Sequence, residues 1–461
     1  MSIDSRKGLW NIGRSFAARH ARTGIKVVRM KKASKKLRWI AIPVVLGTGV
    51  WLWFVKFESE KPSVKELPET TILGRELNIK AEDRKTGLAE MKVEAVQSGQ
   101  TVTLFSTTVP KKTHSFEKTI PLRPLPPGLG EGEAVLRITA EDRSWNGGNV
   151  TTLEKKVIID TRPPQLSVLG GPHYINRGGA GLVVLAANED IPMSGIKIGD
   201  VFFPGTSAGR NRALVYFALP VDAPADAAFS ASAEDIAGNQ THLPFHPNIK
   251  SKTPKSDKVD LTDKFLGNVV PYFKSIDSGL QGTDIEIFLT VNRKQRGLDY
   301  EQIKKICADT APQPLWSGPF LRLPNSKPMA LFGDRRAYLY RGREIDRQIH
   351  LGVDLASTQQ CPIPAANAGR VVFAGPLGIY GLSVVLDHGC GVFSMYSHLS
   401  RTEVEVKKDV AKGDILGRSG STGMAGGDHL HFAMLVRGIF VNPVEWWDAH
   451  WIRDNIELKL R

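Results

Sequence analysis

Cysteine is scarce in this chain, which has three in 461 residues: Cys307, Cys361 and Cys390. An odd number cannot all pair within one chain, so a fold held together throughout by disulfide bonds is excluded. One bridge remains open, and we expect it between Cys361 and Cys390 because both fall in the C-terminal part of the chain. Such a bridge requires an oxidising compartment.

Negative charge is almost absent from the first 38 residues, which hold twelve Lys or Arg and a single acid, Asp4. This segment alone carries +11 of the formal net charge of +14, which leaves +3 for the other 423 residues. A protein that binds nucleic acid through its folded body would carry its positive charge there. We therefore expect no nucleic-acid partner, and we interpret residues 1–38 as a basic cytoplasmic tail.

Long apolar runs are also rare, and the clearest is Trp39–Val55, which has 17 residues and no charge. That length is at the short end of what spans a bilayer, and tryptophans near both ends suit the membrane interface. We expect one transmembrane helix over 39–57. The alternatives are a buried soluble helix and a cleaved signal peptide, but KFESEKPSV offers no small-x-small cleavage site. The positive-inside bias then puts the N-terminus in the cytoplasm and the chain after Lys56 on the extracytoplasmic (periplasmic) side of the inner membrane.

Short alternating runs separated by turn residues fill residues 58–247 and are typical of antiparallel strands in a sandwich. Two modules are predicted, 58–161 and 162–247, because ITAEDRSWNGGNVT (138–151) is echoed by ASAEDIAGNQT (231–241). In each copy Ala-Glu-Asp ends a strand, a turn with Gly and Asn follows, and Thr opens the next strand. Both resemble the penultimate hairpin of bacterial immunoglobulin-like domains, which makes cell-envelope proteins candidate partners.

A polar, proline-containing segment opens a linker with helices at 248–315. Helices are expected in DLTDKFLGNVVPYF and DYEQIKKICAD, the second capped by Asp299 with Gln302 three residues on. A glycine-rich domain of short strands follows at 316–451, ahead of a C-terminal tail at 452–461. The predicted fold class is therefore mainly β: one transmembrane helix, two immunoglobulin-like β-sandwich modules, a short helical linker and a β-rich C-terminal domain.

Histidine is scarce as well, yet six of the 11 follow residue 349. IHLGVDLA places His350 four residues before Asp354, YSHLS contains His398, and DHLHF contains His429 and His431. Residues i and i+2 of a strand face the same side, so the last two imidazoles are expected to share one face. A hydrolytic zinc site needs three protein ligands and one open position for water. The surplus of nitrogens in this set suits the proton transfers of such a reaction.

The order of these residues resembles the lysostaphin/LytM-type zinc metallopeptidases. The resemblance runs from about residue 332 to 447 through HLGVDLA, PIPAANAGRVVFAG, YGLSVVLDHGCGVFSMYSHLS, VAKGDILGRSGSTGMAGGDHLHF and VNPVEWW. Position by position, it implies one zinc ion (Zn2+) per chain held by His350, Asp354 and His431, with His398 and His429 as catalytic imidazoles. Which of these two is the general base stays open. The resemblance also implies that the substrate is peptidoglycan, cut at peptide bonds of its stems or cross-links.

Three further features have competing interpretations. His388 in LDHGCG is expected to be structural, because a hairpin turn explains it. The arginines of FGDRRAYLYRGRE (332–344) either form a solvated face or meet acidic stem-peptide carboxylates. GRSGSTGMAGG (417–427) lacks the Gly-Lys-Ser/Thr ending of a phosphate-binding loop and is interpreted as a flexible wall of the substrate groove.

The sequence therefore predicts a membrane-anchored zinc metalloendopeptidase that remodels the cell wall by hydrolysing peptidoglycan peptides. The alternative is a regulator or scaffold that activates a partner cell-wall hydrolase without turnover of its own. Relatives that act in this way have lost zinc ligands, whereas all five key positions are kept here. A peptidase that acts on a protein substrate is a third interpretation.

Overall fold

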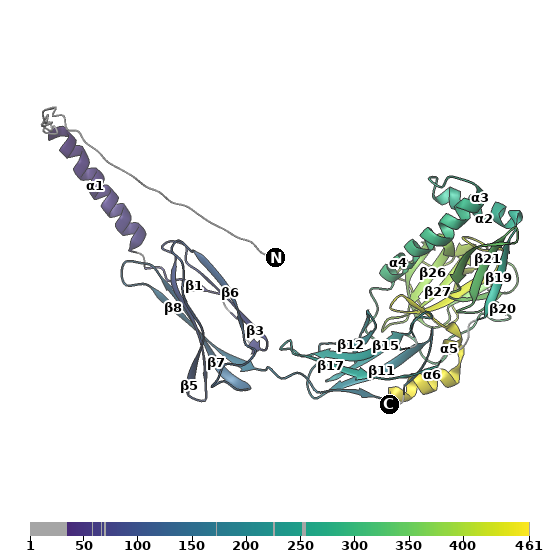
Figure 1. Cartoon of the computed structure of the whole chain (residues 1–461), viewed down its shortest axis with the longest axis horizontal. Helices are drawn as coiled ribbons and strands as arrows, with labels where there is room; N and C mark the ends of the chain where they lie inside the picture. The colour runs from purple at the N-terminus through teal and green to yellow at the C-terminus, as the bar shows by residue number, and fades with distance from the viewer. Residues whose placement is uncertain are drawn as a thin grey trace, which may run out of the picture.

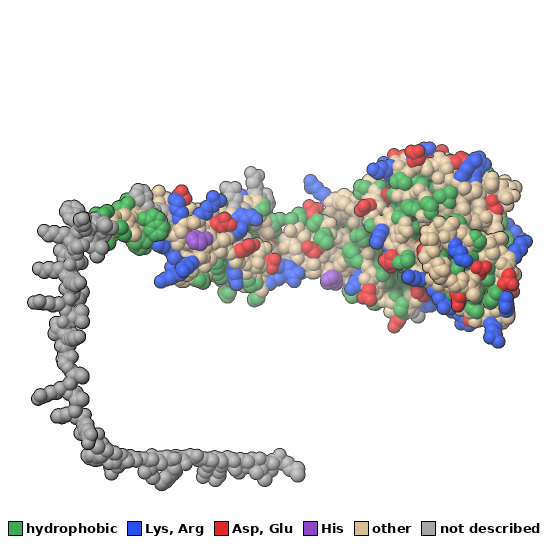
Figure 2. Space-filling view, turned by 90° about the horizontal axis from the view of Figure 1, so that it is seen from above, with side chains coloured by type: hydrophobic (Ala, Val, Ile, Leu, Met, Phe, Trp, Pro, Cys, Tyr) green, Lys and Arg blue, Asp and Glu red, His purple; other side chains and the backbone are tan. Residues whose placement is uncertain are grey.

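The computed structural model describes residues 35–57, 59–65, 67–68, 71–171, 173–224, 226–250 and 255–460. Figure 1 shows an N-terminal helix, a first β module, and a larger body made of a second β module and the C-terminal domain. Of the predicted basic tail, residues 1–34 lie outside the described part of the chain. Acidic and basic side chains are interspersed over the larger body (Figure 2), as its small net charge leads one to expect.

Helix α1 (Lys35–Lys56) covers most of the predicted apolar segment. Among the residues that the structure describes, however, no helix is both long enough and apolar enough to cross a membrane. The membrane span predicted over 39–57 is therefore not supported by the described residues.

Two sheets with one shared apolar core form the first β module. Their strand orders are β2-β8-β7-β4-β5 and β1-β3-β6. Alternate residues of β7, such as Leu136, Ile138 and Ala140, enter the core because side chains alternate along a strand. The module is thus a β-sandwich as predicted, and its immunoglobulin-like identity stays a prediction. The strand bounds are β1 (Ser63–Val64), β2 (Thr71–Leu73), β3 (Glu76–Glu82), β4 (Leu88–Gln97), β5 (Gln100–Thr108), β6 (Ser115–Pro121), β7 (Gly132–Asp142) and β8 (Val150–Ile159).

The second β module has two four-stranded sheets, with orders β14-β15-β11-β9 and β13-β12-β16-β17, and a parallel pair β10-β18. Strand β18 begins where the linker was predicted to begin, so residues 248–250 pair within this module. The bounds are β9 (Leu166–Leu169), β10 (Tyr174–Asn176), β11 (Ala180–Ala187), β12 (Met193–Ile198), β13 (Val201–Pro204), β14 (Thr206–Ser207), β15 (Arg212–Ala218), β16 (Phe229–Glu234), β17 (Gln240–Phe245) and β18 (Asn248–Lys250).

The repeated Ala-Glu-Asp segment occupies equivalent hairpins in the two modules, β7–β8 and β16–β17. In the first turn, the Asp142 carboxylate accepts hydrogen bonds from the backbone and side-chain nitrogens of Asn149, both at 2.8 Å. In the second, Asp235 accepts the same two bonds from Asn239 at 2.8 and 2.9 Å. The threonine that follows donates to a proline carbonyl at 2.5 Å in both modules, from Thr151 to Pro62 and from Thr241 to Pro164. The sequence repeat is therefore a structural repeat.

An eight-stranded sheet forms the centre of the C-terminal domain, in the order β20-β23-β31-β27-β26-β25-β29 with β32 paired to β31. Smaller sheets β24-β30-β28 and β19-β21-β22 accompany it. Strand β19 comes from the predicted linker and pairs in parallel with β21, so the end of the linker is part of this domain. The bounds are β19 (Ser256–Leu261), β20 (Lys327–Ala330), β21 (Arg335–Tyr340), β22 (Arg343–Ile349), β23 (Val353–Ala356), β24 (Pro362–Pro364), β25 (Gly369–Pro376), β26 (Leu382–Asp387), β27 (Val392–Leu399), β28 (Arg401–Thr402), β29 (Asp409–Val410), β30 (Ile415–Arg418), β31 (Leu430–Val436) and β32 (Ile439–Val441).

Helices α2 to α4 lie together on one side of this domain, and α5 and α6 lie near the C-terminus (Figure 1). The two predicted linker helices form, and α3 was not predicted. The predicted cap at Asp299 is wrong, because Asp299 lies inside α4. Its carboxylate instead accepts a bond of 2.7 Å from the backbone nitrogen of Ile379, which ties the helix to the domain. The helix bounds are α2 (Asp263–Ile276), α3 (Asp284–Thr290), a π-helical turn (Val291–Gln295), α4 (Arg296–Ile306), α5 (Pro443–Trp447), α6 (Ala449–Asn455) and 3-10 turns (Gly378–Tyr380, Glu457–Lys459).

The predicted bridge between Cys361 and Cys390 does not form, since all three cysteines are free and buried. The backbone nitrogen of Cys361 donates to the Ser419 hydroxyl. The Cys390 thiol lies 3.5 Å from the Pro312 carbonyl oxygen instead. The two thiols pack in different surroundings, and membership of one domain was too weak a basis for pairing them.

The second β module and the C-terminal domain share one continuous apolar core. Leu182 and Phe217 of the module and Trp446 of the domain contribute to it. Glu445 of α5 crosses this contact. Its carboxylate accepts hydrogen bonds from the Asn176 side chain at 2.6 Å and the Ala180 backbone nitrogen at 3.0 Å. Burial raises the pKa of Glu445 to about 7, although these two donors act in the opposite direction.

Replacing Glu445 with Gln is expected to stabilise the protein at alkaline pH. Because the pKa rises from 4.5 to about 7 on folding, wild-type stability is greatest below 4.5 and falls as the pH rises through about 7. A shift of this size corresponds to at most about 3 kcal/mol. Gln removes the titration and keeps both contacts if the Asn176 amide turns over. By calorimetry, we expect its Tm to exceed that of wild type at pH 8 and to match it at pH 4.5. Equal Tm values at pH 8 would contradict the raised pKa.

Candidate active site

Three neighbouring strands of the central sheet bring the five predicted residues together. Asp354 on β23 pairs with His431 on β31, and β31 pairs in turn with β27, which carries His398. His429 precedes β31 by one residue, and His350 lies between β22 and β23. Residues that are far apart in the sequence thus meet because β31 runs between the other two strands.

Three ligand atoms converge to within hydrogen-bonding distance of one another. His350 Nε2 lies 3.0 Å from Asp354 Oδ1 and 3.1 Å from His431 Nδ1, and His431 Nδ1 lies 2.9 Å from the same oxygen. All three residues are buried, and these atoms are a potential metal-binding group. Zinc bonds of about 2.0–2.1 Å in a tetrahedral site place ligand atoms about 3.4 Å apart. The donor set and its spacing therefore fit a zinc ion.

Neighbouring side chains stabilise the negative charge of Asp354. Burial alone would raise the pKa of this carboxyl, but the electrostatic influence of His350 and close polar contacts with three histidines hold it well below its ordinary value. On the other side of the carboxylate, Arg336 Nη2 donates to Asp354 Oδ2 at 2.7 Å. An ionised carboxylate in this position is the state that binds a metal ion.

The two predicted catalytic imidazoles lie side by side, with ring centroids 4.9 Å apart. His398 Nδ1 lies 2.7 Å from the Thr422 carbonyl oxygen, and His429 Nδ1 lies 2.8 Å from that of Gly427. A carbonyl oxygen only accepts, so both Nδ1 atoms carry the proton. Both Nε2 atoms are then left for chemistry, and that of His429 lies 3.6 Å from Asp354 Oδ1.

Hydrogen bonds tie the middle of the glycine-rich segment 417–427 to the domain. The Thr422 hydroxyl donates to the Leu399 carbonyl at 2.8 Å and accepts from the Leu382 backbone nitrogen at 2.9 Å. The Met424 backbone nitrogen donates to the Ile379 carbonyl. Because the Thr422 carbonyl also accepts the hydrogen bond from His398 Nδ1, this segment orients a site residue. Its interpretation as a flexible wall of the substrate groove stays a prediction.

Gly352 is required by space and not by backbone conformation. A Cβ at this position would lie 2.4 Å from His431 Nε2 and 2.8 Å from the Phe432 carbonyl oxygen. The close approach of the His431 ring could not be read from the sequence because it depends on how β23 and β31 pair.

Two other sequence features fall into place around the site. His388 is fully buried and bonds the Ala368 carbonyl at 2.6 Å and the Ser394 hydroxyl at 2.7 Å, so it is structural as predicted. Of the arginine run, Arg335 is exposed, whereas Arg336 bonds Asp354. Sequence reasoning missed the contact of Arg336 with Asp354. The only signal in the sequence was that Arg336 shares a strand face with the apolar residue Tyr338.

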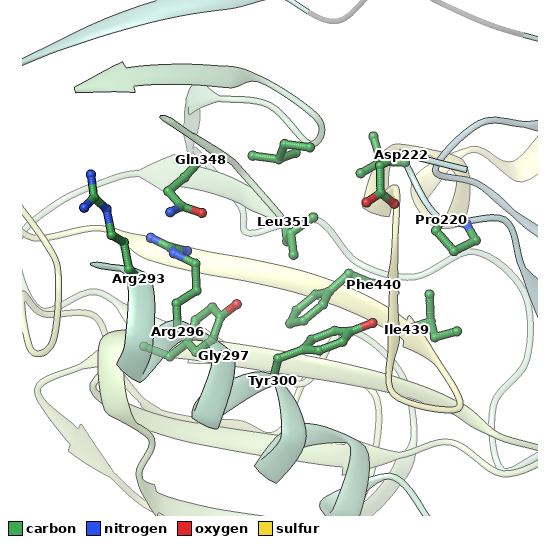
Figure 3. Close-up of a pocket in the computed structure, with 13 residues that line it drawn as sticks. Pro220, Asp222, Arg293, Arg296, Gly297, Tyr300, Gln348, Leu351, Ile439 and Phe440 are labelled. Carbon is green, nitrogen blue, oxygen red and sulfur yellow. The ribbon is translucent and has the colours of Figure 1, made fainter. Parts of the chain in front are cut away.

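A pocket of about 430 Å³ lies behind the site, and none of the five predicted residues lines it. Figure 3 shows Pro220 and Asp222 of the second β module on one side and Arg296 and Tyr300 of α4 on the other. Leu351, which follows His350, also contributes to its lining. The pocket marks the seam where the module, the helices and the domain meet.

Comparison with known proteins identifies the domain. Residues 348–443 match the model of peptidase family M23. A DD-carboxypeptidase/endopeptidase, Mpg, of Neisseria meningitidis is 38% identical over 97 residues, 21% of this chain and 22% of that protein. The murein hydrolase activator EnvC of Escherichia coli is 34% identical over 95 residues, 21% of this chain and 23% of that protein.

A solved structure gives a similar result. The catalytic domain of lysostaphin from Staphylococcus simulans is 29% identical, with a TM-score of 0.24, and the match covers 27% of this chain and 92% of that one. The chain spans less than a quarter of the length of the two curated relatives. These three matches cover 21–27% of this chain.

Replacing Gly352 with Ala is expected to weaken zinc binding, because the added methyl group displaces the His431 ring from the position that its ligand atom requires. Disturbing the groups that orient a ligand typically lowers metal affinity by about 10–100-fold. Competition with a chromophoric chelator measures the effect. Gly267→Ala in α2 is the control, since a Cβ there meets nothing within 4 Å. Equal zinc affinity in both variants would show that Gly352 does not set the site.

Proposed function

We propose that this protein is a zinc metalloendopeptidase that hydrolyses peptide bonds of peptidoglycan stems or cross-links, because residues 348–443 match the model of peptidase family M23. The observation that carries the proposal is the convergence of one carboxylate oxygen and two imidazole nitrogens within 3.1 Å, with two further imidazoles beside them. The substrate class is supported by the relatives, of which one is named a DD-carboxypeptidase/endopeptidase.

His350, Asp354 and His431 would hold the zinc ion, which lowers the pKa of a bound water to about 7 and polarises the scissile carbonyl. His398 and His429 supply two imidazole Nε2 atoms beside these ligands, because backbone carbonyls occupy both Nδ1 protons. One neutral imidazole accepts the proton of the attacking water at Nε2, and the other, when Nε2 is protonated as well, donates a hydrogen bond to the oxyanion that develops on the substrate. Burial of the ligand residues limits access of bulk water to this group.

The same substrate implies a location. Peptidoglycan lies outside the cytoplasm, so we propose that the catalytic domain acts on the extracytoplasmic side of the inner membrane. Peptidoglycan is then the principal partner, and contacts of the two β modules with envelope proteins follow as a secondary proposal.

Activation of a partner hydrolase is the second candidate function, and it is favoured by the similarity to a murein hydrolase activator. An activator needs a binding groove but no metal. The buried group formed by His350, Asp354 and His431 argues for the peptidase, because three converging ligands have no purpose in a groove that only binds.

Incubation of the full-length, zinc-loaded protein with cross-linked sacculi tests the proposal. We expect about one equivalent of zinc, new amine termini, and muropeptides whose masses identify the bond that is cut. Loss of these products on treatment with a chelator, and their return with zinc, would tie turnover to the metal. A zinc-loaded protein that releases no amine from sacculi contradicts the proposed function.

The paired histidines are expected to differ in their effects. His431→Ala should abolish stoichiometric zinc binding, because it removes a ligand atom. His429→Ala should retain zinc and lower kcat by about 100-fold or more, the usual loss for a general acid or base. Atomic absorption and the sacculus assay measure the two effects. Equal zinc loss in both variants would refute this division of labour. Stimulation of a partner hydrolase by His431→Ala would favour the activator.

A further inference from the structure

We propose that Arg336 is a positioning residue that fixes the Asp354 carboxylate so that only one of its oxygens faces the metal. The inference rests on the zinc site of the proposed function. Arg336 lies twelve residues before the segment that matches the family model, which begins at residue 348. The role is therefore one that the family match does not assign to this chain.

The two oxygens of Asp354 have separate surroundings. Oδ2 accepts the hydrogen bond of 2.7 Å from Arg336 Nη2. Oδ1 lies 3.0 Å from His350 Nε2, 2.9 Å from His431 Nδ1 and 3.6 Å from His429 Nε2. The carboxylate is thus divided between a guanidinium on one side and the histidines on the other.

The fold places Arg336 there through the alternation of β21. Arg335 is exposed, whereas the Arg336 side chain is only 21% exposed and shares its face of the strand with buried Tyr338. Strand β21 is the central strand of β19-β21-β22, so it is held on both edges. A guanidinium supported in this way has little freedom to leave the carboxylate.

A carboxylate that is free to turn can offer a metal ion either one oxygen or two. Arginine stays charged at every working pH and presents its donors in a rigid plane, so it occupies Oδ2 permanently. Oδ1 is then the oxygen left for the metal, and the remaining coordination positions stay open for water and substrate. Preserving an open position is the property that separates a catalytic zinc site from a structural one.

The residues just before Arg336 orient a second ligand. The Leu331 carbonyl accepts the Nδ1 proton of His350 at 3.0 Å, which leaves Nε2 for the metal. The Asp334 carbonyl accepts from the His350 backbone nitrogen at 2.9 Å. Residues 331–336 therefore support two of the three ligands from outside the matched segment. This agreement between independent contacts is what a supporting shell for a metal site requires.

Zinc affinity gives a test whose sign is informative. A positive charge near a cation repels it, so a purely electrostatic role for Arg336 predicts tighter zinc binding once the charge is removed. A positioning role predicts weaker binding, by about 10–100-fold. Arg336→Met removes the charge and the donors, Arg336→Lys keeps the charge and a donor, and Arg335→Met is the matched control on the opposite face of β21.

In the full-length protein, competition with a chelator measures zinc affinity, and the visible absorption of the cobalt-substituted protein reports the coordination geometry. We expect weaker zinc binding and an altered cobalt spectrum for Arg336→Met, recovery of most of the affinity by Arg336→Lys, and no more than a twofold change for Arg335→Met. Should the Met variant fail to fold, Arg336→Gln removes the charge and is too short to replace the Nη2 contact with Oδ2, so it is expected to bind zinc about tenfold more weakly. Unchanged or tighter zinc binding by the folded neutral variant overturns the proposal.

This measurement is separate from peptidoglycan cleavage. If wild type binds zinc but cleaves no sacculi, the proposed function fails while the affinity comparison still decides the role of Arg336. If wild type cleaves sacculi and Arg336→Met binds zinc as tightly as wild type does, the positioning role alone fails.

Discussion

The Asp354 carboxylate is the group on which the geometry of the site depends. A buried negative charge is unfavourable unless charged or polar groups compensate it from close range. Here a guanidinium holds one oxygen, and two histidines face the other at about 3 Å. Each of these partners comes from a different strand or loop, so the compensation of this charge depends on the pairing of β23 with β31 and on the position of β21 in its own sheet. Gly352 belongs to the same constraint, because its missing side chain is the space that the His431 ring occupies.

The unit that supports this site is larger than the segment that matches the peptidase family. Strand β19 and helices α2 to α4 come from the linker, yet they pair with or pack against the domain. The second β module shares the apolar core of the domain and reaches Glu445 on α5 with two hydrogen bonds. The first module is different, since its core is separate and it meets the second through contacts such as that of Arg123 with Asn239. The linker elements and the second β module, which lie upstream in the sequence, thus pack around the domain that carries the site.

How much of this the sequence could predict depended on the range of the interactions. The hairpin repeat, the two linker helices and the shared face of His429 and His431 follow from local periodicity, and the structure contains all of them. The Asp299 cap and the Cys361–Cys390 bridge were wrong because long-range packing decides both. Arg336 was left between two interpretations for the same reason: adjacent arginines look alike in a sequence, and only strand pairing tells which of them faces Asp354. The membrane span was inferred from a run of uncharged residues, and the described helices give it no support.

The difference between His429 and His431 follows from which ring nitrogen is occupied. In His350, His398 and His429, Nδ1 donates a hydrogen bond to a backbone carbonyl. This bond fixes the tautomer and directs Nε2 toward the site. His431 is turned the other way: Nδ1 faces Asp354 and His350, and Nε2 has no hydrogen-bond partner among the described residues. His429 and His431 lie two positions apart, so their rings share one face. The Gly427 carbonyl accepts a hydrogen bond from the His429 ring, whereas the His431 ring fills the space left by the missing side chain of Gly352. The two histidines therefore present different ring nitrogens to the site because their backbone environments differ, although the side chains are the same.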